Sequence, residues 1–358
     1  MNQHYVMVGE KMKIGILTWF YGSNYGAKAQ SYALQQVLKS FGVDVFMIDY
    51  RHKNYKRVNK KMNYDYTHIK FHPFRFYRCI KKNKILSNTN YLYNLTKRVA
   101  GAEAINSLNL DVIILGSDAI FNINHPFYDP LYMGVGINLV KIAYSPSCEN
   151  LSPDFVLSDK EVESLKSFKK ISVRDYNTQA LLEKNINKKP LITCDPTILY
   201  DFNEIEFDWK YQDYILVYSF SEWNEYAAEI RKFANNHRLS IISVGRYCVW
   251  ADVSIEDASF EQWVVSFKFA TYVFTDSFHG TVFALKNSKN LIMVSREDKR
   301  AKIESLLDDV GVNRRFLLPK ESVDLYVNRD KINYLDVRKK LGNLKEKSIE
   351  YLKNALEL

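Results

Sequence analysis

The feature that most constrains the fold is a repeated alternation of short apolar runs with helical stretches. The first series of runs lies at 13–19, 43–48, 111–115, 141–144, 171–173 and 191–193, and the second at 214–218, 240–244, 272–275 and 291–294. Continuous apolar runs of this length indicate strands that are covered on both faces, as in parallel sheets. We therefore predict an α/β fold with two Rossmann-like, doubly wound domains that face a cleft.

The length of 358 residues, with 47% hydrophobic content, fits two domains. A strand-poor stretch near 200–212 separates the two series, which places an N-terminal domain at 12–205 and a C-terminal domain at 206–332. The N-terminal domain carries a basic aromatic insertion at about 51–100. In the second series we expect helices at 222–236, 260–269 and 280–286, and another that begins at 301. The amphipathic tail, 333–358, is expected to form a helix that packs back on the body.

Composition indicates a cytoplasmic protein. No stretch approaches the roughly 20 apolar residues of a membrane span, and residues 1–11 lack the apolar core of a signal peptide. The four cysteines lie far apart without a CxxC pair, which argues against a zinc site and gives no disulfide framework. We predict a reducing compartment and no metal.

The formal charge of +9 is concentrated in one segment. Residues 51–98 hold fourteen Lys or Arg against one acid, Asp65, whereas 36 basic and 40 acidic residues leave the rest at −4. Aromatic residues interleave with these cations: Tyr64, Tyr66, Phe71, Phe74, Phe76 and Tyr77 alternate with Lys70, Arg75 and Arg78. The pattern suits peripheral contact with an anionic membrane surface, and it equally suits a solvated insertion that packs on its own aromatics. We predict no nucleic-acid partner, because no nucleic-acid module signature accompanies the patch.

Polar residues that directly follow strands are the candidate ligands, because open α/β sheets bind at the carboxyl ends of their strands. After the first strand, Asn24, Tyr25 and Gly26 open a helix that continues through Gln30, and a helix start favours an anion. After the 111–115 strand comes Ser117 with Asp118, whose carboxylate could accept a proton from a sugar hydroxyl. The alternative for Asp118 is a residue that merely caps a turn.

Three further turns carry polar groups. The sequence Asp-Ser-Phe-His-Gly at 276–280 places His279 at a helix start, where the macrodipole opposes its protonation but favours a bound phosphate. Arg174 follows the 171–173 strand and could form a fork on a carboxylate or phosphate, or else pair with the adjacent loop. Asp195, in an Asp-Pro-Thr turn, is interpreted as structural.

Taken in order, these stretches resemble the polysaccharide pyruvyl transferase family. The matching segments are GSNYGAKAQSYAL (22–34), GSDAIFN (116–122), KIAYSPS (141–147), ISVRD (171–175), CDPTIL (194–199) and TDSFHGTVFA (275–284), and the resemblance spans about 13–310. Two positions depart from the family pattern. Ala119-Ile120-Phe121 replaces Gln-Val-Trp, and Lys302 replaces the Arg that usually opens the last domain helix, keeping the charge but losing the fork.

The resemblance implies a fold like that of the B-type glycosyltransferases, without a nucleotide-sugar donor. It implies that phosphoenolpyruvate donates a carboxyethylidene group to two hydroxyls of one sugar, with no obligatory cofactor. Arg174, Ser277, Phe278, His279, Gly280 and Lys302 would bind the donor, and Asn24, Tyr25, Gly26, Gln30 and Ser117 would form an acceptor-side or anion loop. Asp118 would be the base, and His279 the acid or a phosphate ligand.

The acceptor implied by the resemblance is a sugar of a polysaccharide or a lipid diphosphate-linked repeat unit. Such units are assembled at the inner membrane face, where the basic segment would hold the enzyme peripherally. Two alternatives stay open: a glycosyltransferase of the same fold that uses a nucleotide sugar, and a non-catalytic protein that binds an anionic glycan. The sequence predicts no oligomeric state.

Overall fold

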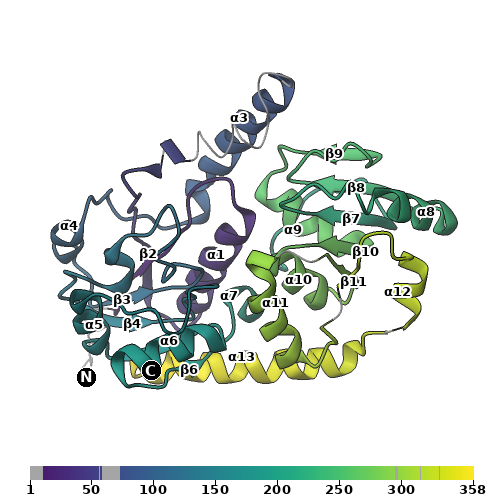
Figure 1. Ribbon diagram of the computed structural model, residues 1–358. Helices are drawn as coiled ribbons and strands as arrows, with labels where there is room; N and C mark the ends of the chain where they lie inside the picture. Colours follow the sequence, from purple (N-terminus) through teal and green to yellow (C-terminus); the bar gives the residue numbers. More distant parts are fainter. Residues whose placement is uncertain (1–10, 56, 59–72, 295–296, 315, 330) are drawn as a thin grey trace, which may run out of the picture.

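The computed structural model describes residues 11–55, 57–58, 73–294, 297–314, 316–329 and 331–358, and it contains two parallel sheets that lie side by side with helices around them (Figure 1). The N-terminal sheet has the order β2-β1-β3-β4-β5-β6, with strands β1 (Lys13–Leu17), β2 (Asp44–Met47), β3 (Val112–Leu115), β4 (Val140–Ala143), β5 (Lys170–Val173) and β6 (Leu191–Ile192). The C-terminal sheet has the order β11-β10-β7-β8-β9, with strands β7 (Tyr214–Tyr218), β8 (Ser240–Val244), β9 (Val253–Ile255), β10 (Ala270–Thr275) and β11 (Asn290–Met293). The predicted fold class is confirmed.

Short polar side chains start several of the helices that follow the strands. Asn24 caps α1, Asp175 caps α6, Asp195 caps α7 and Ser277 caps α10, each by accepting backbone N–H groups of the first turn. The N-terminal domain has α1 (Tyr25–Lys39), α3 (Pro73–Ser87), α4 (Ala102–Asn106), α5 (Asp159–Lys166), α6 (Tyr176–Ile186) and α7 (Pro196–Leu199), with 3-10 turns η1 (Thr89–Leu92) and η2 (Pro130–Met133). The C-terminal domain has α8 (Ala227–His237), α9 (Phe260–Phe269), α10 (Phe278–Lys286), α11 (Glu297–Val310) and α12 (Val323–Arg329), and α13 (Tyr334–Leu356) ends the chain.

In each sheet the strand order reverses at one point, because later strands are added on the other side of the first strand. In the N-terminal sheet β1 lies between β2 and β3, and in the C-terminal sheet β7 lies between β8 and β10. Loops that leave the strands at such a point diverge and open a crevice at the carboxyl ends. The loops after β1, β3, β7 and β10 are therefore the ones that can form a site.

Apolar packing joins the two domains below that crevice. Tyr25 at the start of α1 stacks on Trp263 of α9 with ring centroids 5.6 Å apart, and its hydroxyl donates to the Ala258 carbonyl at 2.7 Å. Helix α13 runs beneath both domains (Figure 1), and its Tyr351 hydroxyl donates to the Ala143 carbonyl of β4 at 2.9 Å. One hydrophobic cluster contains buried residues of both sheets together with α13. A large apolar interface of this kind restricts movement between domains.

Two helix starts differ by four or more residues from their predicted positions, and a third helix, α10, begins at Phe278 instead of 280. Helix α8 begins at Ala227 instead of 222, because Asp276 accepts hydrogen bonds from the Phe220 amide and the Ser221 hydroxyl and so holds this stretch as a loop. Helix α11 begins at Glu297 instead of 301, so Lys302 lies in its second turn and does not open the helix. Residues 297–300 are all charged in the sequence, so no apolar periodicity marked this start.

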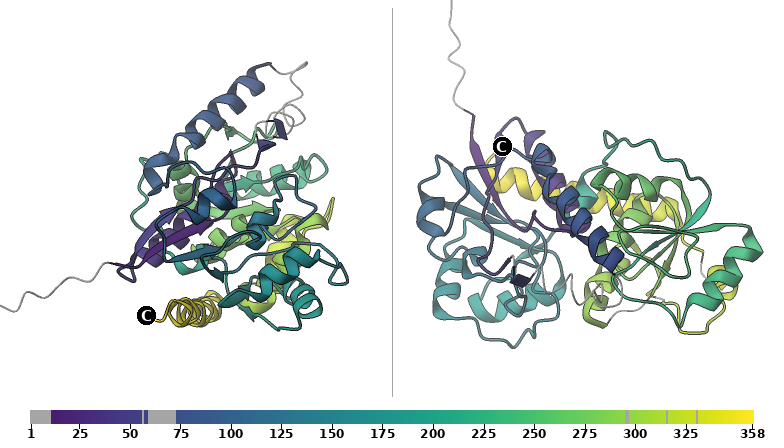
Figure 2. Two further views of the ribbon diagram at one scale, coloured as in Figure 1. Left: turned by 90° about the vertical axis from the view of Figure 1, so that its left-hand side faces the viewer. Right: turned by 90° about the horizontal axis from the view of Figure 1, so that it is seen from above.

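The described part of the basic insertion reaches the C-terminal domain. On α3, Arg78 pairs with Glu256 at 3.1 Å, Lys81 with Asp257 at 2.5 Å, and Lys82 donates to the Gly245 carbonyl at 2.8 Å. The views of Figure 2 show α3 extending from the first domain toward the second. Several of the cations are therefore used in contacts between domains. Tyr64, Tyr66, Lys70 and Phe71 lie outside the described residues.

Candidate active site

A cleft of about 340 Å³ opens where the two switch points face each other. Its lining residues come from both domains: Trp19, Tyr21, Gly22, Ser23, Asn24, Ala27, Tyr55, Asp118, Ala119, His125, Phe127 and Glu149 from the first, and Phe220, Asp276, Ser277, Phe278, His279 and Lys302 from the second. The loops after β1 and β3 thus meet the loops after β7 and β10. A ligand in this cleft would contact both domains at once.

His279 is fixed by a contact across the domain boundary. It lies in the first turn of α10, is 8% exposed, and faces the start of α1. A Cβ atom added to Gly26 would come 2.1 Å from Nδ1 of His279, far closer than any real contact, so only glycine leaves room for the imidazole. Gly26, in the turn after the first strand, therefore leaves the space that His279 of the other domain occupies.

A buried charge cluster lies beside His279. Asp195 is 1% exposed; its Oδ2 accepts a 2.9 Å hydrogen bond from Nη1 of Arg174 and lies 3.6 Å from Nε2 of His279. Nη1 of Arg174 is also 3.8 Å from Oδ1 of Asp118. Because β5 and β6 are neighbours, their following residues Arg174 and Asp195 meet at one sheet edge, and α10 of the second domain brings His279 to the same place.

Two pKa values in this cluster are shifted toward the ionised forms, and some of its nitrogen atoms have no hydrogen-bond partner in the described part of the chain. Burial alone would raise the pKa of Asp195, but His279 and Arg174 outweigh it and hold that pKa well below its ordinary value. Burial opposes the charge of Arg174, yet Asp195 and Asp118 raise its pKa above the ordinary value. Nε and Nη2 of Arg174 and Nε2 of His279 are buried and have no hydrogen-bond partner within the described part of the chain. Each such group costs about 1–3 kcal/mol unless a ligand or water pairs with it.

Phe278 separates Arg174 from the open cleft and lies close to a second cation. The Arg174 guanidinium is 4.9 Å from the centroid of the Phe278 ring, and Nζ of Lys302 is 5.9 Å from it. Lys302 also forms a 2.8 Å ion pair with Glu149, and both side chains of that pair are largely buried. Arg174 is therefore one layer beneath the surface of the cleft, whereas Lys302 is on it.

Asp118 sits on a loop that buried polar residues support. Its Oδ1 accepts a 2.9 Å hydrogen bond from the Ala119 amide, and its backbone is in the left-handed region at φ 73°. The Gln30 side chain donates to Thr18 and to the Trp19 carbonyl and accepts from the Ser117 amide, so it ties the loops after β1 and β3 together. The Asp118 carboxylate is thus held in place by the buried residues beneath its loop.

The structure brings some of the predicted site residues to the cleft and not others. Among the predicted residues, those that line it are Asn24, Asp118, Ser277, Phe278, His279 and Lys302. The others contact the frame: Tyr25 packs on Trp263, Gly26 abuts His279, Gln30 and Ser117 are fully buried beneath the loops, Gly280 packs on Thr275, and Arg174 lies behind Phe278. Asn24 and Ser277 use their side chains as helix caps.

Sequence reasoning did not assign four residues to the site. Asp195, interpreted as structural, connects Arg174 to His279. Glu149 pairs with Lys302, and no motif marked it. Trp19 and His125, with ring centroids 4.2 Å apart, form part of an aromatic wall on the first-domain side. Only the position of Trp19 directly after β1 offered a signal.

The described residues around the cleft form no recognisable metal site. Within the described residues, no group of three or more His, Cys, Asp or Glu is placed to hold a metal ion. The cleft combines a cationic, imidazole-bearing wall with a carboxylate and aromatic rings. This arrangement can bind a small anion next to a polar, ring-shaped molecule and can move protons between them.

Three solved structures share this fold across nearly the whole chain. The structure is similar to Staphylococcus aureus MnaA in complex with UDP (TM-score 0.52, 11% identity, 97% of both chains). It is also similar to the UDP-GlcNAc 2-epimerase of Neisseria meningitidis bound to UDP-GlcNAc (0.51, 10%, 96% of this chain and 99% of that one). A Listeria monocytogenes protein assigned as a UDP-N-acetylglucosamine 2-epimerase matches with a TM-score of 0.50 (10% identity, 94% of this chain and 90% of that one). These likenesses show the B-type glycosyltransferase fold.

The sequence itself identifies the family. None of the curated proteins matches this chain. The family model of polysaccharide pyruvyl transferase matches residues 24–298, which include the α1 turn, Asp118, Arg174, Asp195 and His279. This stretch is most of the chain and contains most of the cleft. The chain belongs to the polysaccharide pyruvyl transferase family.

Proposed function

We propose that this protein transfers the pyruvyl group of phosphoenolpyruvate to two hydroxyls of one sugar in a polysaccharide or lipid-linked repeat unit. The methylene carbon of the donor takes up a proton and becomes the methyl group. One sugar hydroxyl adds to C2 and loses its proton, and the second replaces phosphate at the same carbon and loses its proton to the departing group. The products are a cyclic ketal and inorganic phosphate.

The observation that carries the proposal is the set of unpaired nitrogen atoms around Asp195. The donor has a phosphate and a carboxylate, and the Nε and Nη2 groups of Arg174 are buried donors without a partner in the described part of the chain. Guanidinium groups bind such anions in a fork. The start of α10 adds the positive end of a helix dipole beside His279. Access to Arg174 requires the Phe278 ring to shift, and Lys302 would exchange Glu149 for the anion.

The other wall of the cleft supports an acceptor sugar. Asp118 lines it and would act as the general base, with Nη1 of Arg174 3.8 Å from its Oδ1. Trp19 and His125 offer ring faces on which an apolar sugar face can lie. His279 faces the donor side, where it would protonate the methylene carbon or bind the phosphate. Asp195, whose Oδ2 lies 3.6 Å from Nε2, would orient the imidazole.

The test is turnover. We expect the full chain to release phosphate from phosphoenolpyruvate only when a suitable glycoside or lipid-linked acceptor is present, with a ketal methyl signal in the NMR spectrum of the product. The panel should cover hexosides, N-acetylhexosaminides and uronides with free neighbouring or 4,6-hydroxyls. Phosphate release without an acceptor-derived ketal would contradict the proposal. Transfer from a UDP-sugar, with no response to phosphoenolpyruvate, would favour the glycosyltransferase alternative.

We also propose a cytoplasmic location with peripheral contact at the membrane. Phe74, Tyr77 and Ile80 are 83%, 64% and 48% exposed, and their spacing of three residues places them along one side of α3. None of the described helices has the length and hydropathy that a membrane-spanning segment requires. Flotation with vesicles should show binding to anionic phosphatidylglycerol and little binding to neutral phosphatidylcholine. A triple change to Ser at the three positions should abolish it, and equal binding to both vesicles would contradict the idea.

A further inference from the structure

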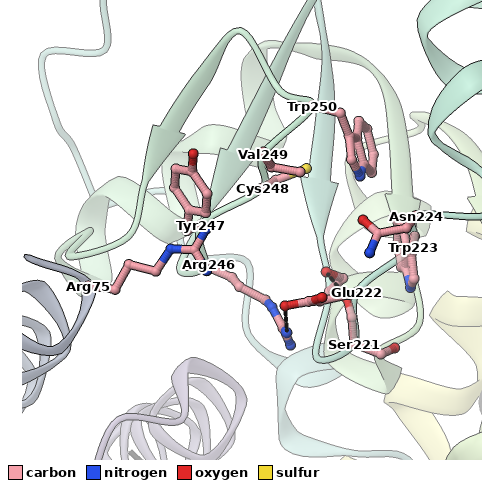
Figure 3. Close-up of a pocket in the computed structure, with 11 residues that line it drawn as sticks. Arg75, Ser221, Glu222, Trp223, Asn224, Arg246, Tyr247, Cys248, Val249 and Trp250 are labelled. Atoms are coloured by element: carbon pink, nitrogen blue, oxygen red, sulfur yellow. Dashed lines mark hydrogen bonds and ion pairs between the residues drawn. The ribbon is translucent and has the colours of Figure 1, made fainter. Parts of the chain in front are cut away.

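A second pocket, of about 290 Å³, opens beside the cleft in the C-terminal domain (Figure 3). It lies at the carboxyl ends of β7 and β8, between the loop that precedes α8 and the loop that precedes β9. Its lining residues are Ser219, Ser221, Glu222, Trp223, Asn224, Arg246, Tyr247, Cys248, Val249 and Trp250, with Arg75 of α3. The basic insertion of the first domain thus completes a pocket of the second.

The lining combines aromatic rings with hydrogen-bonding groups. Tyr247 and Trp250 lie on different sides of the pocket, with Trp223 and Asn224 next to Trp250 (Figure 3). The Trp223 ring is 3% exposed, and its indole N–H has no hydrogen-bond partner within the described part of the chain. Trp223 therefore forms the packed base of the pocket, while Trp250 and Asn224 are the groups that a ligand would meet.

Arg75 adds donors at the rim. Its guanidinium lies 4.0 Å from the centroid of the Tyr247 ring, and no acid of the described residues forms an ion pair with it. A guanidinium that stacks on a ring keeps its N–H groups free to bond in the plane. The rim therefore offers a flat, multiply donating surface next to an aromatic face.

The pocket places one carboxylate, Glu222, next to two guanidinium groups, a mixture of donors and acceptors that suits a hydroxyl-rich ligand. Glu222 lies 3.6 Å from Arg246, which also donates to the Phe220 carbonyl. A diphosphate in this pocket would meet the Glu222 carboxylate, and the loop 219–226 contains no glycine that would let backbone amides approach it. Sugar hydroxyls, in contrast, can donate to a carboxylate and accept from a guanidinium.

The second pocket and the cleft share one wall. Phe220 lines the cleft, whereas its neighbours Ser219 and Ser221 line the second pocket. Asp276, two residues before Phe278, holds this wall through the Phe220 amide at 2.9 Å and the Ser221 hydroxyl at 2.5 Å. A chain molecule that enters the cleft can therefore continue over Phe220 into the second pocket.

We propose that the second pocket binds a sugar unit of the acceptor glycan other than the one that is pyruvylated. The inference rests on the proposed function for the identity of the glycan as acceptor. Aromatic faces in the pocket receive the apolar side of a sugar ring, and Asn224, Glu222 and Arg75 bond its hydroxyls. Such remote binding selects oligosaccharides over single sugars and raises kcat/KM for them.

The experiment uses fluorescently labelled full chain on a microarray of defined bacterial surface oligosaccharides, followed by calorimetry with an oligosaccharide that is retained. Trp250→Ala and Asn224→Ala should each weaken its binding by about ten-fold. Phe74→Ala is the matched control, because Phe74 neighbours Arg75 on α3 but does not line the pocket, and it should bind like the wild type.

The outcomes separate this inference from the proposed function. Unchanged binding in both pocket variants, or no retained oligosaccharide for the wild type, overturns the inference. If UDP competes with the oligosaccharide for the wild type but not for Trp250→Ala, the inference is also overturned, because the pocket then binds a nucleotide. If oligosaccharide binding depends on Trp250 but phosphoenolpyruvate is never consumed, the glycan site stands and the proposed transferase activity falls. With a single-sugar glycoside, turnover by Trp250→Ala should stay within about two-fold of the wild type.

Discussion

Replacing His279 by alanine should lower kcat for phosphate release from phosphoenolpyruvate by about 10²–10⁴-fold, which is the usual contribution of a positioned acid or base. His279 lines the cleft in the first turn of α10, where both of its proposed roles would act on the donor. The two roles differ in kinetics. Loss of an acid lowers kcat with little change in KM, whereas loss of a phosphate ligand that binds the ground state raises KM for the donor. Steady-state phosphate assays with a ketal-forming acceptor measure both.

Gly26→Ala provides a second route to the same result without altering the histidine. The added Cβ would lie 2.1 Å from Nδ1 of His279, so the imidazole must move, and a displacement of about 1 Å can lower the rate by about 10²-fold. Gly342→Ala is the matched control, because nothing lies within 4 Å of a Cβ at that position of α13. Circular dichroism should show that all variants fold. A near-wild-type kcat for His279→Ala would show that His279 is not a catalytic residue.

The fold was predictable because its strands are buried on both faces. Every residue of β3 and of β7 is buried, so each strand appears in the sequence as an unbroken apolar run. Helix starts were less predictable. Glu222 and Trp223 are compatible with a helix, and only the hydrogen bonds from this loop to Asp276, more than fifty residues later, delay α8 to Ala227.

The site was predictable only as a set of loops. That Arg174, Asp118 and His279 follow strands could be seen, and strand order explains why such residues meet. Which of them reach the cleft depends on packing between domains. Arg174 is separated from the cleft by Phe278, and Asp195 gains its place between Arg174 and His279 because β5 and β6 are adjacent and α10 comes from the other domain. No local pattern encodes such a contact.

Replacing Asp195 by asparagine should lower the free energy of unfolding by about 3 kcal/mol at neutral pH, near the lower end of the roughly 3–5 kcal/mol for breaking a buried ion pair. The change leaves Arg174 buried at 5% exposure, with its nearest remaining carboxylate, Asp118, 3.8 Å away. Asparagine can still cap α7, which keeps the loss near that lower end. Urea denaturation followed by tryptophan fluorescence measures it. Asp154→Asn is the control, because Asp154 pairs with Lys184 at the surface with a 79% exposed side chain, and its loss should stay below about 1 kcal/mol.

The pH dependence of that loss identifies the charge as its cause. His279 and Arg174 overcome the effect of burial and lower the pKa of Asp195 in the folded protein. A carboxyl group whose pKa is lower in the folded than in the unfolded protein stabilises the folded state. Its full contribution is present above the unfolded pKa of about 3.9 and is lost as the pH falls toward the folded pKa. The difference between wild type and Asp195→Asn should therefore be constant near neutral pH and shrink below about pH 4. A difference that does not change with pH would mean that asparagine disturbs packing, and that the negative charge of Asp195 does not hold Arg174 and His279 in place.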